Sequence, residues 1–170
     1  MKLIIFSIFT IFLWAFSASA QAPAVTKINN EAALRLEVEN GKKLDLKSAD
    51  LAKLPRREIR VRNQDDKETV YEGVEVREIL QLADVKFGKE FDRVNLPRYL
   101  TVEAADNYRV VFAFAELDVA FNEKMILLVE KADGKLLPEK YGRWQIVVPD
   151  EKKRGRWVRQ VVALKVKSAQ

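Results

Sequence analysis

Short segments in which apolar and polar residues alternate constrain the fold of this chain more than any other feature. A period of two places every second side chain on one face, which predicts half-buried β-strands. Turn residues such as Gly41 and Asp133-Gly134 separate these segments. The predicted strands are residues 34–38, 43–46, 58–62, 68–71, 100–103, 108–112, 125–129, 144–148 and the second half of 157–166.

Helical spacing of apolar residues is confined to a few places. Ser48 is predicted to cap a brief helix that ends near Pro55. Residues 74–82 have the pattern of an amphipathic helix that covers the sheet, and residues 114–121 fit a third short helix. Because the elements do not follow a βαβ order, the sequence predicts an α+β domain with mainly antiparallel sheets and two or three short helices.

The first residues have the pattern of a secretory signal peptide. Met1-Lys2 is followed by an apolar stretch of fourteen residues, 3–16, and then by Ala18-Ser19-Ala20. The alternative is an uncleaved anchor, but a span needs about 20 apolar residues. We expect a signal peptide at 1–20 cut after Ala20, a flexible leader at 21–33 and a single domain at 34–170. The protein would then be periplasmic or secreted, with no membrane span after cleavage.

The whole sequence contains no Cys and no His. Its stability must therefore come from burial and not from disulfides. The chain has no thiolate nucleophile, no soft metal ligand and no imidazole base, which excludes most hydrolytic and redox mechanisms. The net charge of +5, which becomes +4 when residues 1–20 with Lys2 are removed, is weak evidence for an anionic ligand or a membrane surface. Nucleic acid is not expected, because the basic face of residues 56–62 lacks aromatic stacking platforms.

Four groups of fragments follow the order and spacing of a known family. They are 71–74 with 79–85; 101–108; 127–128 with 133–138; and 141–142 with 145–149 and 157–166. Through these fragments, residues 55–166 resemble the molybdopterin-binding oxidoreductase domain family, which has the sulfite oxidase fold. The resemblance implies a sulfite oxidase-like α+β fold for this chain.

The departures from that family bear on function. Its enzymes ligate molybdenum through a cysteine thiolate, and this chain has no Cys. Tyr141 replaces the family's His, and Asn107 replaces a Gly but tolerates a positive φ. We therefore expect no cofactor and a non-catalytic binding or accessory module for a small anionic ligand or a periplasmic partner protein. The alternatives are a molybdopterin-binding oxidoreductase with a non-thiolate metal site, and an interaction protein without a pocket.

Two loops contain most of the candidate ligand-binding residues. The basic loop 152–156 can hold an anion, with Trp157 as a stacking wall, and the loop 141–144 combines aromatic rings with a guanidinium. The alternative interpretations are a solvated loop, a buried aromatic cluster and a simple hairpin turn. We expect no catalytic residue and no metal ligand. The candidate ligand-binding residues are Tyr108, Tyr141, Arg143, Trp144, Lys153, Arg154, Arg156 and Trp157.

Overall fold

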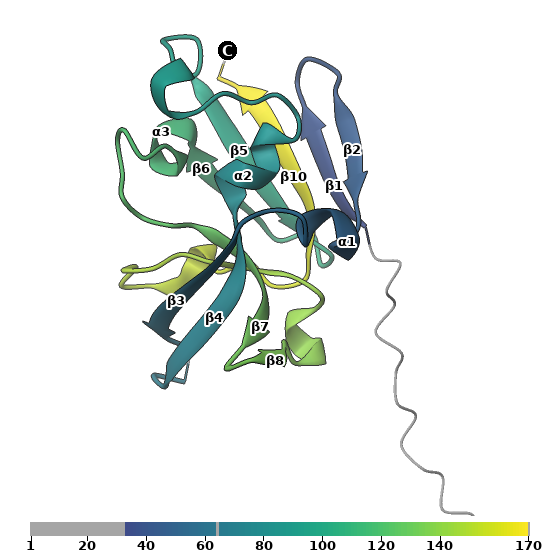
Figure 1. The fold of residues 1–170 in the computed structure, drawn as a ribbon, viewed down its shortest axis with the longest axis vertical. Helices are drawn as coiled ribbons and strands as arrows, with labels where there is room; N and C mark the ends of the chain where they lie inside the picture. Colours follow the sequence, from purple (N-terminus) through teal and green to yellow (C-terminus); the bar gives the residue numbers. More distant parts are fainter. Residues whose placement is uncertain (1–32, 64, 170) are drawn as a thin grey trace, which may run out of the picture.

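The computed structural model describes residues 33–63 and 65–169. The predicted signal peptide and the leader up to residue 32 lie outside the described residues. The described chain forms two sheets, one above the other in Figure 1, and crosses repeatedly between them. In the described ranges, no helix is long and apolar enough to cross a membrane.

The upper sheet, sheet A, contains both ends of the described chain. Its five strands have the order β2-β1-β10-β5-β6. All neighbours are antiparallel except β1 and β10, which pair in parallel, with Leu36 opposite Leu164. The strands are β1 Leu34–Val38, β2 Lys43–Leu46, β5 Arg98–Ala104, β6 Arg109–Ala113 and β10 Val161–Ser168.

The lower sheet, sheet B, is entirely antiparallel. Its strands have the order β3-β4-β7-β8, and β9 also pairs with β7. In Figure 1, β3 lies at the left edge and β4 separates it from β7. The strands are β3 Arg56–Arg62, β4 Glu68–Glu75, β7 Leu127–Ala132, β8 Lys135–Leu136 and β9 Gln145–Val147.

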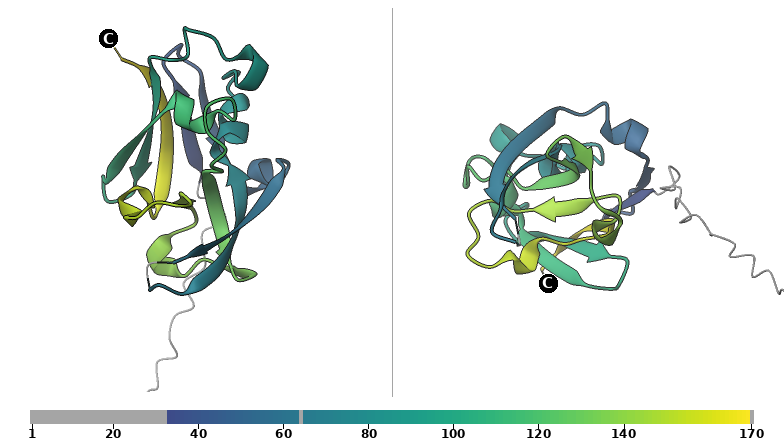
Figure 2. Two further views of the ribbon diagram at one scale, coloured as in Figure 1. Left: turned by 90° about the vertical axis from the view of Figure 1, so that its left-hand side faces the viewer. Right: turned by 90° about the horizontal axis from the view of Figure 1, so that it is seen from below.

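Three short helices, α1 Ser48–Leu51, α2 Val76–Gln81 and α3 Phe114–Leu117, accompany the sheets. Helix α2 lies beside one face of sheet A in both directions of view (Figures 1 and 2) and buries Ile79 and Leu80. It begins two residues later than predicted, because β4 continues along β7 as far as Glu75.

The predicted N-cap of α1 is wrong. Lys47 is the N-cap, and its backbone N–H donates to the carboxylate of Asp50 at 3.1 Å. The Ser48 hydroxyl instead accepts a hydrogen bond from Arg143 Nε at 3.1 Å. The Ser48 hydroxyl therefore contacts a residue 95 positions away and does not cap the helix, although local sequence predicted a cap.

One cluster of buried apolar side chains extends through both sheets and the helices. Alternate residues of β1, β5 and β10 contribute to it, including Leu36, Leu100 and Leu164, each with 0% exposure. The loops after β5 and before β10 meet at the lower end of sheet A. The Ala105 N–H donates to the carbonyl of Gln160 at 3.0 Å, which brings the β5–β6 turn next to the segment that follows the basic loop.

Candidate functional site

A hollow of about 280 Å³ lies between the β5–β6 turn and the loop that precedes β10. The turn contributes Asp106 and Tyr108, and the loop contributes two arginines and an indole. Three of the predicted ligand-binding residues therefore share one hollow. Its lining residues are Ala104, Asp106, Tyr108, Arg154, Gly155, Trp157 and Arg159.

The β5–β6 turn positions Tyr108 toward the basic loop. Asn107 has a φ of 68°, in the left-handed region that the sequence predicted this residue to tolerate. The carboxylate of Asp106 accepts the backbone N–H of Tyr108 at 3.0 Å and so fixes the turn. The Tyr108 hydroxyl donates to the carbonyl of Gly155 at 2.7 Å, which links the two walls of the hollow.

Arg154 is the best-placed cation of the hollow. Its Nε and Nη2 donate to the carbonyl of Arg62 at 3.1 and 2.9 Å, and its guanidinium lies 5.5 Å from the Trp157 ring centroid. These contacts hold the planar group without neutralising it. Among the ion pairs of the described residues, none includes Arg154, so its charge remains available to an anion.

Trp157 supports the hollow from the core. Its side chain is 5% exposed, its Nε1 donates to the carbonyl of Val148 at 2.8 Å, and its ring meets Tyr71 edge-to-face at 5.8 Å. Burial raises the pKa of Tyr71 to about 12. The indole therefore lines the hollow while most of its surface is packed.

The loop 141–144 contacts residues 159–160, which follow the basic loop, but does not line this hollow. The backbone N–H of Gln160 donates to the carbonyl of Tyr141 at 2.7 Å, and Arg159 lies 4.8 Å from the Tyr141 ring centroid. A Cβ at Gly142 would meet the Cα of Gln160 at 2.8 Å, so only glycine allows this approach. Sequence alone did not predict this contact.

The other predicted residues have different environments. Arg143 donates to Ser48 and lies 3.8 Å from Glu130, and Trp144 is only 2% exposed. Lys153 is exposed on the basic loop. These three positions lie outside the lining of the hollow.

Arg156 is paired with carboxylates. It forms ion pairs with Glu116, at 2.8 Å, and Glu151. Burial opposes the charge of this guanidinium, but the hydrogen bonds to both carboxylates outweigh burial and raise the pKa of Arg156. Its ring contact with Phe112, at 4.6 Å, attaches the loop to sheet A. Arg156 therefore stabilises the position of the loop, and because its charge is neutralised by two carboxylates it is a poor candidate for binding an anion.

Sequence reasoning missed Asp106 as part of the hollow and left Arg159 out of the candidate residues. Asp106 had only the signal of a turn residue, and a turn residue can equally be structural. Arg159 stood beside the basic cluster in sequence, so its charge was the available signal. The hollow is lined by two guanidiniums and one carboxylate, which leaves a net positive charge.

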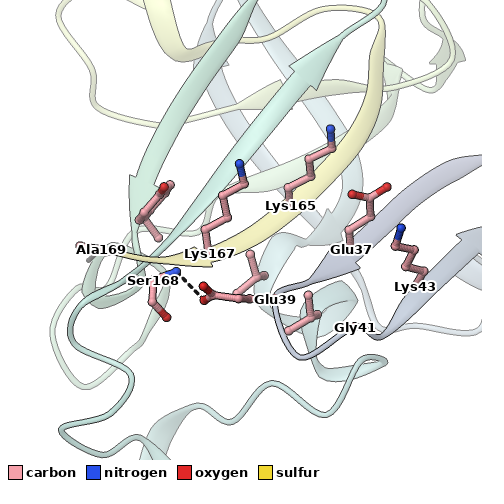
Figure 3. Close-up of a pocket in the computed structure, with 11 residues that line it drawn as sticks. Glu37, Glu39, Gly41, Lys43, Lys165, Lys167, Ser168 and Ala169 are labelled. Atoms are coloured by element: carbon pink, nitrogen blue, oxygen red, sulfur yellow. Dashed lines mark hydrogen bonds between the residues drawn. The ribbon is translucent and has the colours of Figure 1, made fainter.

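A second, larger hollow of about 660 Å³ lies on sheet A near the end of β10 (Figure 3). It contains none of the predicted ligand-binding residues. Figure 3 shows Lys43, Lys165 and Lys167 beside Glu37 and Glu39. Lys165 pairs with Glu103 at 2.7 Å, and Glu39 accepts the backbone N–H of Ser168 at 2.8 Å. Both hollows have one more cation than carboxylates among their lining residues, but Lys165 of the larger hollow is neutralised by Glu103, whereas no ion pair of the described residues includes Arg154.

The residues present do not fit a thiolate-ligated molybdenum centre. The chain supplies no sulfur ligand other than methionine and no imidazole. Within residues 33–63 and 65–169, no group of three or more acidic, Cys or His residues could hold a metal ion. The polar groups that line the hollow are two guanidiniums, one carboxylate, the Tyr108 hydroxyl and backbone atoms.

Comparisons with known proteins support the architecture. No family model and no curated protein sequence matches the chain. Among solved structures, it is similar to the sulfane dehydrogenase SoxCD from Paracoccus pantotrophus, with a TM-score of 0.63 and 19% identity. The likeness covers 82% of this chain but 39% of that chain. The chain thus has the sulfite oxidase-like α+β fold predicted from its sequence.

Proposed function

We propose that the chain is an exported, non-catalytic binding module, and that the hollow beside Arg154 binds a small oxyanion. The observation that carries the proposal is the arrangement of Arg154 and Arg159 on one 280 Å³ hollow. Arg154 is held by the Arg62 carbonyl and the Trp157 ring and not by a carboxylate in the described part of the chain. A preorganised guanidinium with free donors binds oxyanions through charge-assisted hydrogen bonds.

Calorimetric titration tests the binding site. Sodium sulfate, phosphate and thiosulfate are titrated into the purified chain, with chloride keeping the ionic strength constant. We expect one of them to bind with a stoichiometry of one. Arg154→Met should weaken that binding at least ten-fold, because it removes one charge-assisted interaction. Lys153→Met removes the same charge from an exposed position of the same loop and should bind as the wild type does.

Two results would contradict this binding site. One is the absence of binding heat for all three anions at millimolar concentrations. The other is an equal loss of affinity in the two variants, which would mean that only the overall charge of the loop matters. Melting curves of both variants without anion establish that each is folded before the comparison is made.

Export and the lack of catalysis need separate measurements. The proposal for export rests on the pattern of residues 1–20, and we expect the intact mass of periplasmic protein to equal that of residues 21–170. The same preparation, from a host that makes molybdenum cofactor, is analysed for metal. Stoichiometric molybdenum or a bound pterin would overturn the non-catalytic proposal in favour of an oxidoreductase. A bare polypeptide mass supports the proposal.

A further inference from the structure

Strand β3 is an edge strand with backbone groups directed away from the sheet. Asn63 N donates to the carbonyl of Lys67, so the odd-numbered residues of β3 bond to β4 and the even-numbered residues face outward. The Arg62 carbonyl fits this alternation, because it accepts Arg154 from outside the sheet. Among the described residues, no group outside the sheet hydrogen-bonds to the backbone of Glu58 or Arg60.

A groove of about 510 Å³ runs beside this free edge. Loops from two other parts of the chain form its far side, and apolar groups from Ile59, Val61, Met125 and Pro149 contribute to it. An additional extended strand placed in this groove can bond to the outward N–H and C=O groups. Its remaining lining residues are Glu58, Arg60, Asn122, Glu123, Lys124 and Asp150.

The charges of β3 select one partner and one register. In an antiparallel pair of two β3 strands centred on Ile59, Glu58 of each copy lies opposite Arg60 of the other. Ile59 then lies opposite Ile59. Centring on Glu58 or Arg60 would place like charges opposite each other, and centring on Arg57 would place two Arg57 side chains face to face. Opposite charges in directly facing pairs are stabilising, and like charges are destabilising.

We propose that this protein self-associates into a two-fold dimer in which two β3 strands pair antiparallel about Ile59. Charged edge strands usually prevent such pairing, but in this register the central residues Glu58 and Arg60 complement each other. The register also places Arg56 opposite Arg62 of the other copy, and the ion pairs of Arg56 with Glu72 and Glu130 offset that like-charge contact. The hydrogen bonds between Glu58 and Arg60 of the two copies extend sheet B across the dimer. Arg154, which holds the Arg62 carbonyl, limits the paired segment to the middle of the strand.

A charge exchange tests both the interface and its register. Sedimentation equilibrium of the purified chain from 5 to 500 µM should give a concentration-dependent monomer–dimer equilibrium. Glu58→Arg and Arg60→Glu should each raise the dissociation constant at least ten-fold, because each creates two like-charge pairs. The double variant Glu58→Arg/Arg60→Glu restores opposite charges and should regain a dissociation constant within about three-fold of the wild type.

Strand β2 supplies the matched control. Its Lys43 and Asp45 also alternate in charge on an edge strand, but β2 has four residues and β3 has seven. Lys43→Asp should leave the dissociation constant unchanged. A wild-type protein that is monomeric throughout the range overturns the proposal, as does a dimer that Lys43→Asp disrupts or that the double variant fails to restore. Far-UV circular dichroism confirms that every variant is folded.

Discussion

Trp157 joins the candidate site to the core, and its replacement tests that role. The indole is 5% exposed, donates to the Val148 carbonyl at 2.8 Å and meets the Tyr71 ring. Trp157→Ala should lower the free energy of unfolding by about 3 kcal/mol or more, as truncation of a buried aromatic side chain does. Urea denaturation measures the loss. Trp157→Phe keeps an aromatic ring and should lose less; an unchanged midpoint for the Ala variant would contradict the packed environment.

The buried phenol of Tyr71 makes the folded state sensitive to alkali. Burial raises its pKa to about 12, against about 10 in an unfolded chain. Between these pH values the folded state holds a proton that the unfolded state has lost, so stability falls as pH rises. The loss attributable to Tyr71 should be on the order of 2 kcal/mol at pH 12. The stabilising contribution of Tyr71 is present in full below pH 10.

Tyr71→Phe isolates this contribution from other groups that titrate in alkali. Urea denaturation at pH 8 and pH 11 gives the change in unfolding free energy for each protein. The wild type should lose more than Tyr71→Phe over this interval. Equal losses would mean that the phenol ionises as easily in the folded protein as in the unfolded chain.

The strands of sheet A are joined by charge pairs on their polar face. Glu103 of β5 pairs with Lys165 of β10 at 2.7 Å and with Arg109 of β6 at 3.1 Å. The hydrogen bond from Lys165 lowers the pKa of Glu103 and outweighs the opposing effect of burial. The folded state therefore favours the carboxylate, which stabilises it above the unfolded pKa of about 4.3. This stabilisation is lost as pH falls through the folded pKa.

Glu103→Gln should accordingly make the free energy of unfolding less dependent on pH in the acid range. We expect the wild type to lose more unfolding free energy than this variant between pH 5 and pH 3, as measured by urea denaturation. Glu123→Gln removes an exposed carboxylate from the loop before β7 and serves as the control. If both variants follow the wild type, the Glu103 pairs do not contribute to sheet A.

Period-two alternation predicted most strands, because a strand with one buried face shows that pattern locally. It could not predict strand partners. The parallel pairing of β1 with β10 joins Leu36 to Leu164, and nothing in either segment identifies the other. In the candidate site too, local features were predictable and long-range contacts were not. The positive φ of Asn107 was predictable from its residue type, whereas the neutralisation of Arg156 by Glu116, 40 residues away, was not.

The two sheets share buried side chains, and the chain crosses between them several times. β1 and β10, from opposite ends of the sequence, are neighbours in sheet A, and β3, β4, β7, β8 and β9 lie in sheet B. Unfolding sheet B alone would expose the apolar side chains that it shares with sheet A and α2 in one buried cluster. With no disulfide to hold either sheet, the physical expectation is one cooperative transition.

Two probes with different locations test this cooperativity. Fluorescence from Trp144 and Trp157 reports the loops and core next to sheet B, whereas far-UV circular dichroism reports the strands of both sheets. Their urea transitions should coincide within error, and a reducing agent should shift neither, because the sequence has no Cys. A fluorescence change that precedes the circular dichroism change would mean that the region of the hollow opens first. Anion binding would then raise the free energy of that local opening and leave the later circular dichroism transition unchanged, since a ligand stabilises only the states that can bind it.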